Sequence, residues 1–152
     1  MKTTLLKIIL SSIIICLNFG CASADPHTKH FTNLSKHPKS RAIMVRLTTY
    51  SRTEKGCDKW TKKGKSSTGI KLKDKVSAAV DPKIIPYFSK VFIPEIKLNL
   101  FVCDTGGAVK SRLASRRNGR NEPILDLYFD RESDAKKFRL NNPEIVEALI
   151  LN

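Results

Sequence analysis

The sequence predicts one mainly β domain, built from six short strands and one or two short helices. From residue 42 onward, runs rich in β-branched and aromatic residues alternate with turn signals, as in a compact β domain and not a helical bundle. The length of 152 residues is that of one ordinary domain, which excludes large multidomain enzymes. A hydrophobic fraction of 41% can fill a core, which excludes a wholly disordered chain.

The first 24 residues are typical of a secretory signal. A short basic start is followed by the apolar run Ile8–Phe19 and by small residues that end at Ala24. That run is shorter than the roughly 20 residues a helix needs to cross a bilayer. We therefore expect cleavage after Ala24, export to the periplasm or the cell exterior, and no transmembrane segment in the mature chain. A lipid anchor at Cys21 is the less favoured alternative, because Asn18 stands where a lipobox requires an aliphatic residue.

Residues 25–41 are expected to form a flexible basic lead-in, because they are polar and contain few side chains that could bury a face. This segment contains all three histidines. His27 and His30 lack a cysteine or carboxylate partner at ligand spacing, so we predict no metal site.

The domain proper is expected over residues 42–152. Its prolines separate the strands, and Gly106–Gly107 is expected to make a turn at positive φ. A helix is expected over Ser133–Leu140, with Asp130 or Ser133 as its N-cap. The expected strands are Ala42–Tyr50, Val76–Val80, Lys90–Ile93, Leu98–Cys103, Ile124–Tyr128 and Ile145–Leu151.

Two cysteines remain after the signal, Cys57 and Cys103. In an oxidising compartment they would form a disulfide; the alternative is two free thiols with Cys103 buried at the end of an apolar run. Trp60, the only tryptophan, lies in the basic stretch Ser51–Lys65. Its ring would either stack on a sugar or pack against the core.

The formal charge of +14 predicts attraction to polyanions. Because the chain is expected to be exported, nucleic acid is excluded as the physiological partner, and cell-wall glycan and other envelope polyanions remain. The alternative is that the charge only keeps the protein soluble.

Three aspartates lie at or within the ends of apolar runs: Asp81, Asp104 and Asp126. Aspartate disfavours strands, so a further reason must keep it there. Carboxylates gathered in a half-buried cleft repel one another, so one of them should hold a proton at neutral pH. The alternative is structural: Asp81 and Asp104 would cap turns, and Asp126 would pair with a lysine.

The segments that contain these aspartates, Ala79–Pro86, Asp104–Lys110 and Leu125–Asp130, resemble in order the motifs of the three-aspartate (3D) domain family. Thr48–Tyr50 is similar to the opening strand of that family, and Ser67–Gly69 to its small-residue turn. The family includes the catalytic barrel of membrane-bound lytic transglycosylase A and small stationary-phase-survival type wall enzymes. The resemblance spans about Val45–Leu151 and implies a six-stranded double-psi β-barrel.

The resemblance also implies cleavage of the β-1,4 bond between N-acetylmuramic acid and N-acetylglucosamine of peptidoglycan, with a 1,6-anhydro product and no cofactor. Asp104 would be the single general acid/base, Asp126 its electrostatic partner and Asp81 a supporting residue. A non-catalytic peptidoglycan-binding module is the alternative. The residues expected to contact substrate are Thr49, Tyr50, Thr68, Gly69, Thr105, Gly106, Gly107 and Lys110.

The chain departs from the family pattern in two ways. It lacks the second domain that walls the groove of the larger enzyme, so a single barrel would hold glycan through its loops or as a possible homodimer. The basic stretch Ser111–Pro123 also intervenes between the second and third motifs. That insertion would contact acidic stem peptides, block the cleft, or be a tolerated surface loop.

Overall fold

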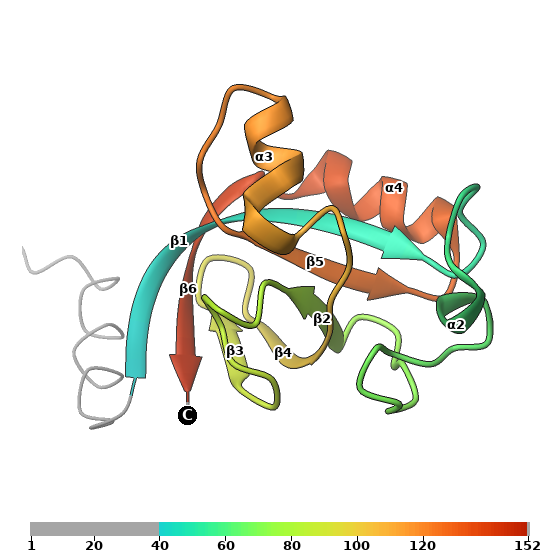
Figure 1. Ribbon diagram of the computed structural model, residues 1–152. Coiled ribbons are helices and arrows are strands. Elements are labelled where there is room, and N and C mark those ends of the chain that lie inside the picture. Colours follow the sequence, from blue (N-terminus) through green and yellow to red (C-terminus); the bar gives the residue numbers. More distant parts are fainter. Residues whose placement is uncertain (1–39, 152) are drawn as a thin grey trace, which may run out of the picture. The chain divides into compact units, whose positions relative to one another are not determined.

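The strands form a closed barrel in the order β1-β5-β2-β4-β3-β6 (Figure 1). This computed structural model describes residues 40–151, and the expected signal and most of the lead-in lie outside them. The barrel confirms the mainly β, six-stranded fold class. The strands are β1 (Ser40–Ser51), β2 (Ser77–Val80), β3 (Lys90–Ile93), β4 (Leu98–Asp104), β5 (Ile124–Phe129) and β6 (Ile145–Leu151).

All six expected strands are present, and most of their boundaries agree within a residue. β1 begins at Ser40, two residues before the expected start, because Ser40 and Arg41 continue its antiparallel pairing with β6. The pairings β1–β5 and β2–β4 are parallel and the other four are antiparallel. Both parallel pairings place residues that are distant in the chain beside each other, and both contribute to the candidate site.

Alternate residues of each strand point into the barrel and form its core. On β1, Val45 and Leu47 are buried in the main hydrophobic cluster, whereas Arg46 between them and Thr48 and Tyr50 beyond them are only partly buried. On β5, Leu125 and Leu127 belong to that cluster, and Asp126 between them does not. The aspartate inside an apolar run therefore lies on the outer face of the barrel.

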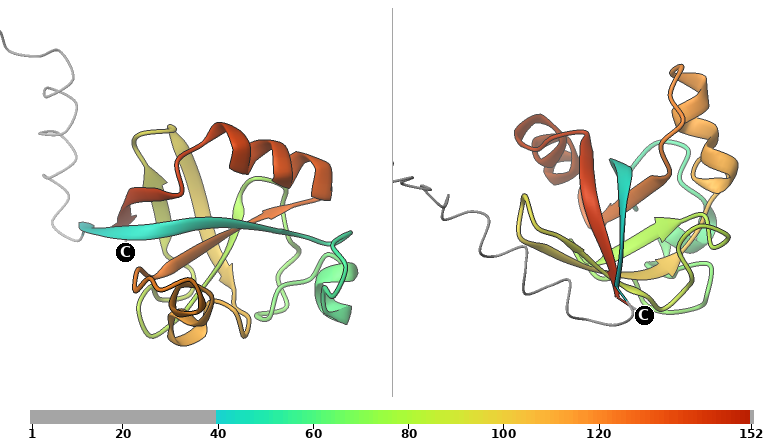
Figure 2. Two further views of the ribbon diagram at one scale, coloured as in Figure 1. Left: turned by 90° about the horizontal axis from the view of Figure 1, so that it is seen from above. Right: turned by 90° about the vertical axis from the view of Figure 1, so that its left-hand side faces the viewer.

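The helices lie on two sides of β1. Figure 2 shows α4 (Glu132–Asn141) on one side, and α2 (Lys59–Lys62) and α3 (Leu113–Arg117) on the other. α4 closes the core, because Phe138 packs on Phe129 with ring centroids 5.3 Å apart. The 3-10 turn η1 (Lys110–Arg112) precedes α3. None of the helices within residues 40–151 is long and apolar enough to cross a membrane.

The expected caps of α4 are wrong. Arg131 occupies the N-cap position and makes no side-chain capping hydrogen bond. The Asp130 carboxylate instead accepts a hydrogen bond from the Tyr128 hydroxyl at 2.9 Å. Glu132 and Asp134 in the first turn place negative charge at the positive end of the helix dipole instead.

The expected disulfide is absent from the structure, in which Cys57 and Cys103 are both free thiols. Cys103 is fully buried and packs with Leu72 and Tyr128 outside the main core. Cys57 lies in the loop after β1, with its Sγ 3.5 Å from the carbonyl oxygen of Asp58. Burial raises the pKa of both thiols. The alternative of two free thiols, with Cys103 buried, is the one observed.

Candidate active site

Two of the three aspartates lie in one row on the outer face of the barrel. Asp126 of β5 pairs with Thr48 on one side and with Ala79 of β2 on the other. Ala79 also pairs with Asp104 of β4, next to a β-bulge. Because laterally paired residues point to the same face of a sheet, Asp126 and Asp104 share this face, with Cα atoms two strand spacings, about 10 Å, apart.

Asp104 is buried, and donors occupy both of its carboxylate oxygens. Oδ1 accepts the backbone N–H groups of Ser67 at 2.7 Å and of Thr105 at 2.9 Å. Oδ2 accepts the hydroxyl of Tyr50 at 2.8 Å. The Asp104 residue as a whole is only 4% exposed. Three donors match an ionised carboxylate, which can only accept hydrogen bonds.

Tyr50 connects Asp104 to the next row of the sheet. It pairs with Tyr128, and the two rings meet edge to face with centroids 5.4 Å apart. Burial and the adjacent charge of Asp104 raise the pKa of the Tyr50 phenol well above its usual value. Tyr50 is therefore a neutral donor to Asp104 at any physiological pH.

Asp126 differs from Asp104 in its contacts and its protonation. It is partly exposed, and its one hydrogen bond among the described residues comes from the Thr48 hydroxyl to Oδ1 at 2.6 Å. Burial of the carboxyl raises its pKa to about 7, and the negative charges of Glu54 and Asp104 add to the effect. It forms no ion pair with a lysine within residues 40–151. Asp126 is therefore the carboxyl group in this row that can hold a proton near neutral pH.

Asp81 has the contacts of a capping residue. Its carboxylate accepts the backbone N–H of Lys83 at 3.0 Å and that of Ser111 at 2.7 Å, and its carbonyl accepts the N–H groups of Ile84 and Ile85. These contacts close the turn after β2 and hold the start of the insertion. They agree with the structural alternative for this residue.

Two neighbouring threonines of β1 have different partners in the structure. Thr49 is buried, and its hydroxyl accepts a hydrogen bond from Arg139 of α4. Thr48 instead contacts Asp126. Because side chains alternate along a strand, these two neighbouring side chains leave β1 on opposite faces, and only that of Thr48 faces Asp126.

The hydroxyls of two further expected contact residues already have structural partners. Thr68 donates to the carbonyl of Cys103 at 2.7 Å, and Thr105 donates to the carbonyl of Val80 at 2.7 Å. Gly69 has a φ of 84° in the turn that carries Ser67. This turn therefore supports Asp104 through Ser67, which is not among the expected contact residues.

Gly106, Gly107 and Lys110 are exposed. The expectation of a positive φ at the two glycines is wrong, because only Gly56, Gly64, Gly69 and Gly119 have one among the described glycines. A Cβ at either Gly106 or Gly107 would meet no atom within 4 Å. The space above this turn is therefore open.

Trp60 does not pack in the core. It is 52% exposed in α2, and Lys59 Nζ lies 5.4 Å from the centroid of its ring. The same loop lines a cavity of about 230 Å³ that reaches Tyr50 and contains Glu54. Glu54, whose negative charge contributes to the raised pKa of Asp126, is a third residue outside the expected set, after Thr48 and Ser67, because a loop glutamate carries no motif.

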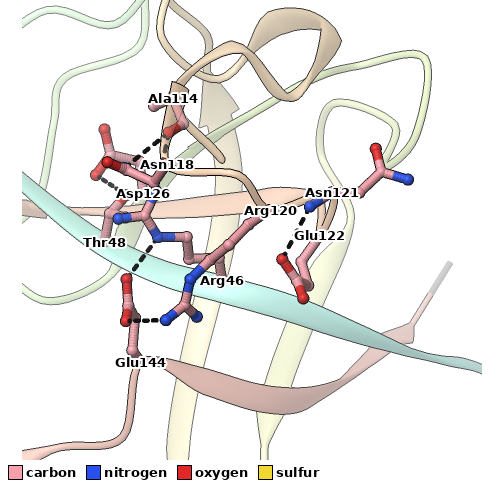
Figure 3. Close-up of polar contacts among 9 residues, drawn as sticks. All are labelled: Arg46, Thr48, Ala114, Asn118, Arg120, Asn121, Glu122, Asp126 and Glu144. Carbon is pink, nitrogen blue, oxygen red and sulfur yellow. Dashed lines mark hydrogen bonds and ion pairs between the residues drawn. The ribbon is translucent and has the colours of Figure 1, made fainter. Parts of the chain in front are cut away.

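The insertion is fixed beside Asp126. Arg46 of β1 donates to the Ala114 carbonyl of α3 at 3.0 Å and pairs with Glu144 at 2.6 Å (Figure 3). Arg120 of the insertion also pairs with Glu144, at 3.2 Å. The insertion therefore stands next to the carboxylate row, anchored by Asp81 at its start and by Arg46 and Glu144 further along.

The residues between 40 and 151 contain no group of three or more His, Cys, Asp or Glu side chains that could hold a metal ion.

Comparison with known proteins gives similarity at the level of structure only. No family model matches the sequence, and no curated protein matches it. One similar solved structure is a single-residue variant of the E. coli lytic transglycosylase MltA in an apo form, with a TM-score of 0.40 and 17% identity. Another is MltA from E. coli, with a TM-score of 0.40 and 19% identity. Each match covers 58% of this chain and 27% of the MltA chain.

Proposed function

We propose that this chain is an exported lytic transglycosylase that cleaves peptidoglycan glycan strands, with Asp126 in place of Asp104 as the single acid/base. The observation that carries this assignment is the contrast between the two carboxyl groups. Asp104 is buried with both oxygens occupied, whereas Asp126 is partly exposed and Oδ2 has no partner among the described residues. The three ordered motifs support the choice of reaction.

In the proposed reaction, protonated Asp126 donates its proton to the glycosidic oxygen as the bond from that oxygen to C1 of the muramyl residue breaks. The C6 hydroxyl of the same residue attacks C1 and loses its proton to the Asp126 carboxylate. One C–O bond breaks and one C–O bond forms. Asp126 gives one proton to the leaving oxygen and takes one from the C6 hydroxyl, so it ends the reaction protonated and no water is consumed. A single carboxyl group is therefore sufficient, unlike the pair that ordinary glycosidases use.

Asp104 has a supporting role in this scheme. As a fixed negative charge it raises the proton affinity of Asp126 and stabilises positive charge that develops at C1. Thr48 positions Asp126 through the hydrogen bond to Oδ1, which leaves Oδ2 for the substrate.

The test is digestion of purified sacculi, with detection of anhydro-muropeptides by mass spectrometry. The wild-type protein should release them, and Asp126→Asn should reduce the rate at least about 100-fold. Glu95→Gln, which removes an exposed carboxylate in the β3–β4 turn, is the matched control and should be fully active. Reducing muramyl ends in place of anhydro ends, or an active Asp126→Asn, would contradict the proposal.

A wall-binding module without catalysis is the second candidate. The two described cavities measure about 210 and 230 Å³, below the roughly 300 Å³ at which small-molecule sites usually begin. Cosedimentation with sacculi that weakens with salt, without release of product, would favour it.

Export after cleavage at Ala24 is part of the proposal and is checked by N-terminal sequencing of the secreted protein.

A further inference from the structure

A second cavity lies against the strand that positions the proposed acid. It measures about 210 Å³, and its wall has an apolar part, formed by Leu47, Phe138 and Pro143, and a polar part, formed by Thr48, Arg46, Arg139, Asn142 and Glu144. Thr48 is the residue whose hydroxyl donates to Asp126. The cavity therefore begins one side chain away from the carboxyl group that would protonate the glycosidic bond.

The charges of this cavity do not cancel. Glu144 is its only acidic residue and is already paired with Arg46 at 2.6 Å and with Arg120 at 3.2 Å. Arg139 forms no ion pair within residues 40–151. The cavity thus retains one unbalanced positive charge, that of Arg139.

Only one nitrogen of the Arg139 guanidinium, Nη1, has a hydrogen-bond partner among the described residues. Its Nη1 donates to the hydroxyl of Thr49 at 2.5 Å and contacts the Thr49 carbonyl at 3.4 Å. Its Nε and Nη2 have no partner among the described residues. Two parallel N–H groups on a fixed guanidinium match the two oxygens of a carboxylate.

We infer that this cavity binds a carboxylate carried by the muramyl residue of the substrate, through Arg139. The inference rests on the proposed function, because the muramyl lactyl ether and the peptide attached to it are the acidic groups of a peptidoglycan strand. Both sources present the same chemistry, and the experiment separates them.

The experiment measures binding by titration calorimetry with three probes. These are an N-acetylglucosaminyl-N-acetylmuramic acid disaccharide with a free lactyl carboxylate, the same disaccharide with that carboxylate amidated, and the disaccharide with a stem peptide. Wild-type protein should bind at least one acidic probe roughly tenfold more tightly than the amide. If only the peptide probe shows this preference, the carboxylate is that of the peptide.

Arg139→Gln should remove the preference for the acidic probe and leave the affinity for the amide unchanged. Lys137→Gln removes one positive charge from the same helix at an exposed position and should keep the preference. Thermal unfolding of each variant checks that the loss of the Thr49 contact has not disrupted α4, and Arg139→Lys retains the charge if it has.

The outcomes separate the two proposals. Equal affinity of the wild-type protein for acid and amide, together with release of anhydro products from sacculi, would overturn the carboxylate site alone. A preference that survives in Arg139→Gln would do the same. Failure to bind any probe and to release any product would overturn the proposed function as well.

Discussion

Replacement of Asp126 by asparagine should stabilise the folded protein by an amount that grows as pH rises above about 4 and is complete above about pH 7. The pKa of Asp126 rises from 3.8 to about 7 on folding because the carboxyl is buried beside other negative charges. Between these values the folded state holds a proton that the unfolded state has lost, so the free energy of unfolding falls as pH rises from about 4 to 7. Asparagine does not ionise, so the variant does not lose this free energy of unfolding as pH rises. Its side-chain carbonyl oxygen can still accept the hydrogen bond from the Thr48 hydroxyl.

The magnitude follows from the shift. At about 1.4 kcal/mol for each pKa unit, the ceiling is about 4 kcal/mol, and solvent screening of the partly exposed carboxyl lowers the expected gain to roughly 1–3 kcal/mol. Urea unfolding followed by circular dichroism at pH 4 and pH 8 measures the gain as a difference between variant and wild type. The control Glu95→Gln should change the free energy of unfolding by less than about 0.5 kcal/mol at both pH values. An Asp126→Asn variant that is equally stable or less stable than wild type at pH 8 would refute the assignment of a raised pKa.

Four further results are expected. Asp104→Asn should lower the free energy of unfolding by about 1–3 kcal/mol in urea titrations, because it removes the charge from a buried acceptor with three donors. Asp81→Ala should release the start of the insertion, so that limited trypsin digestion cuts within residues 111–123 several-fold faster than in wild type. Alkylation of the folded protein, followed by peptide mapping, should label Cys57 and leave Cys103 unmodified until denaturant is added. Phe88→Gly should cost less than about 1 kcal/mol or stabilise the protein in thermal unfolding, because Phe88 has a φ of 70° and is 58% exposed, and glycine adopts that conformation without strain.

The strands could be predicted from the sequence because their signals are local. The run Leu98–Val102 and the prolines around it mark β4 whichever strand lies next to it. The presence of Asp104 and Asp126 in one row was also predictable, although only through the resemblance of their motifs to those of a known family. No periodicity in the sequence predicts that β2 lies between them.

The roles of the two aspartates could not be predicted, because they depend on contacts from distant parts of the chain. Asp104 is satisfied by the backbone of Ser67, 37 residues away, and by the hydroxyl of Tyr50, 54 residues away. Which of Thr48 and Thr49 lies beside Asp126 could not be predicted either, for a similar reason. Both belong to the same motif, and only the register with β5 decides which of them faces Asp126.

Because β2 lies between β4 and β5, the segment between the second and third motifs does not set the distance between Asp104 and Asp126. Ala79 pairs with Asp104 on one side and Asp126 on the other, so their separation is fixed by the ladder and not by the connection that joins them. Residues inserted or deleted between Ser111, which is held by Asp81, and Arg120, which is held by Glu144, would change the surface beside the candidate site without changing the distance between the two aspartates. This connection is therefore the place in the barrel that tolerates new loops best if the chain is redesigned to bind a chosen ligand.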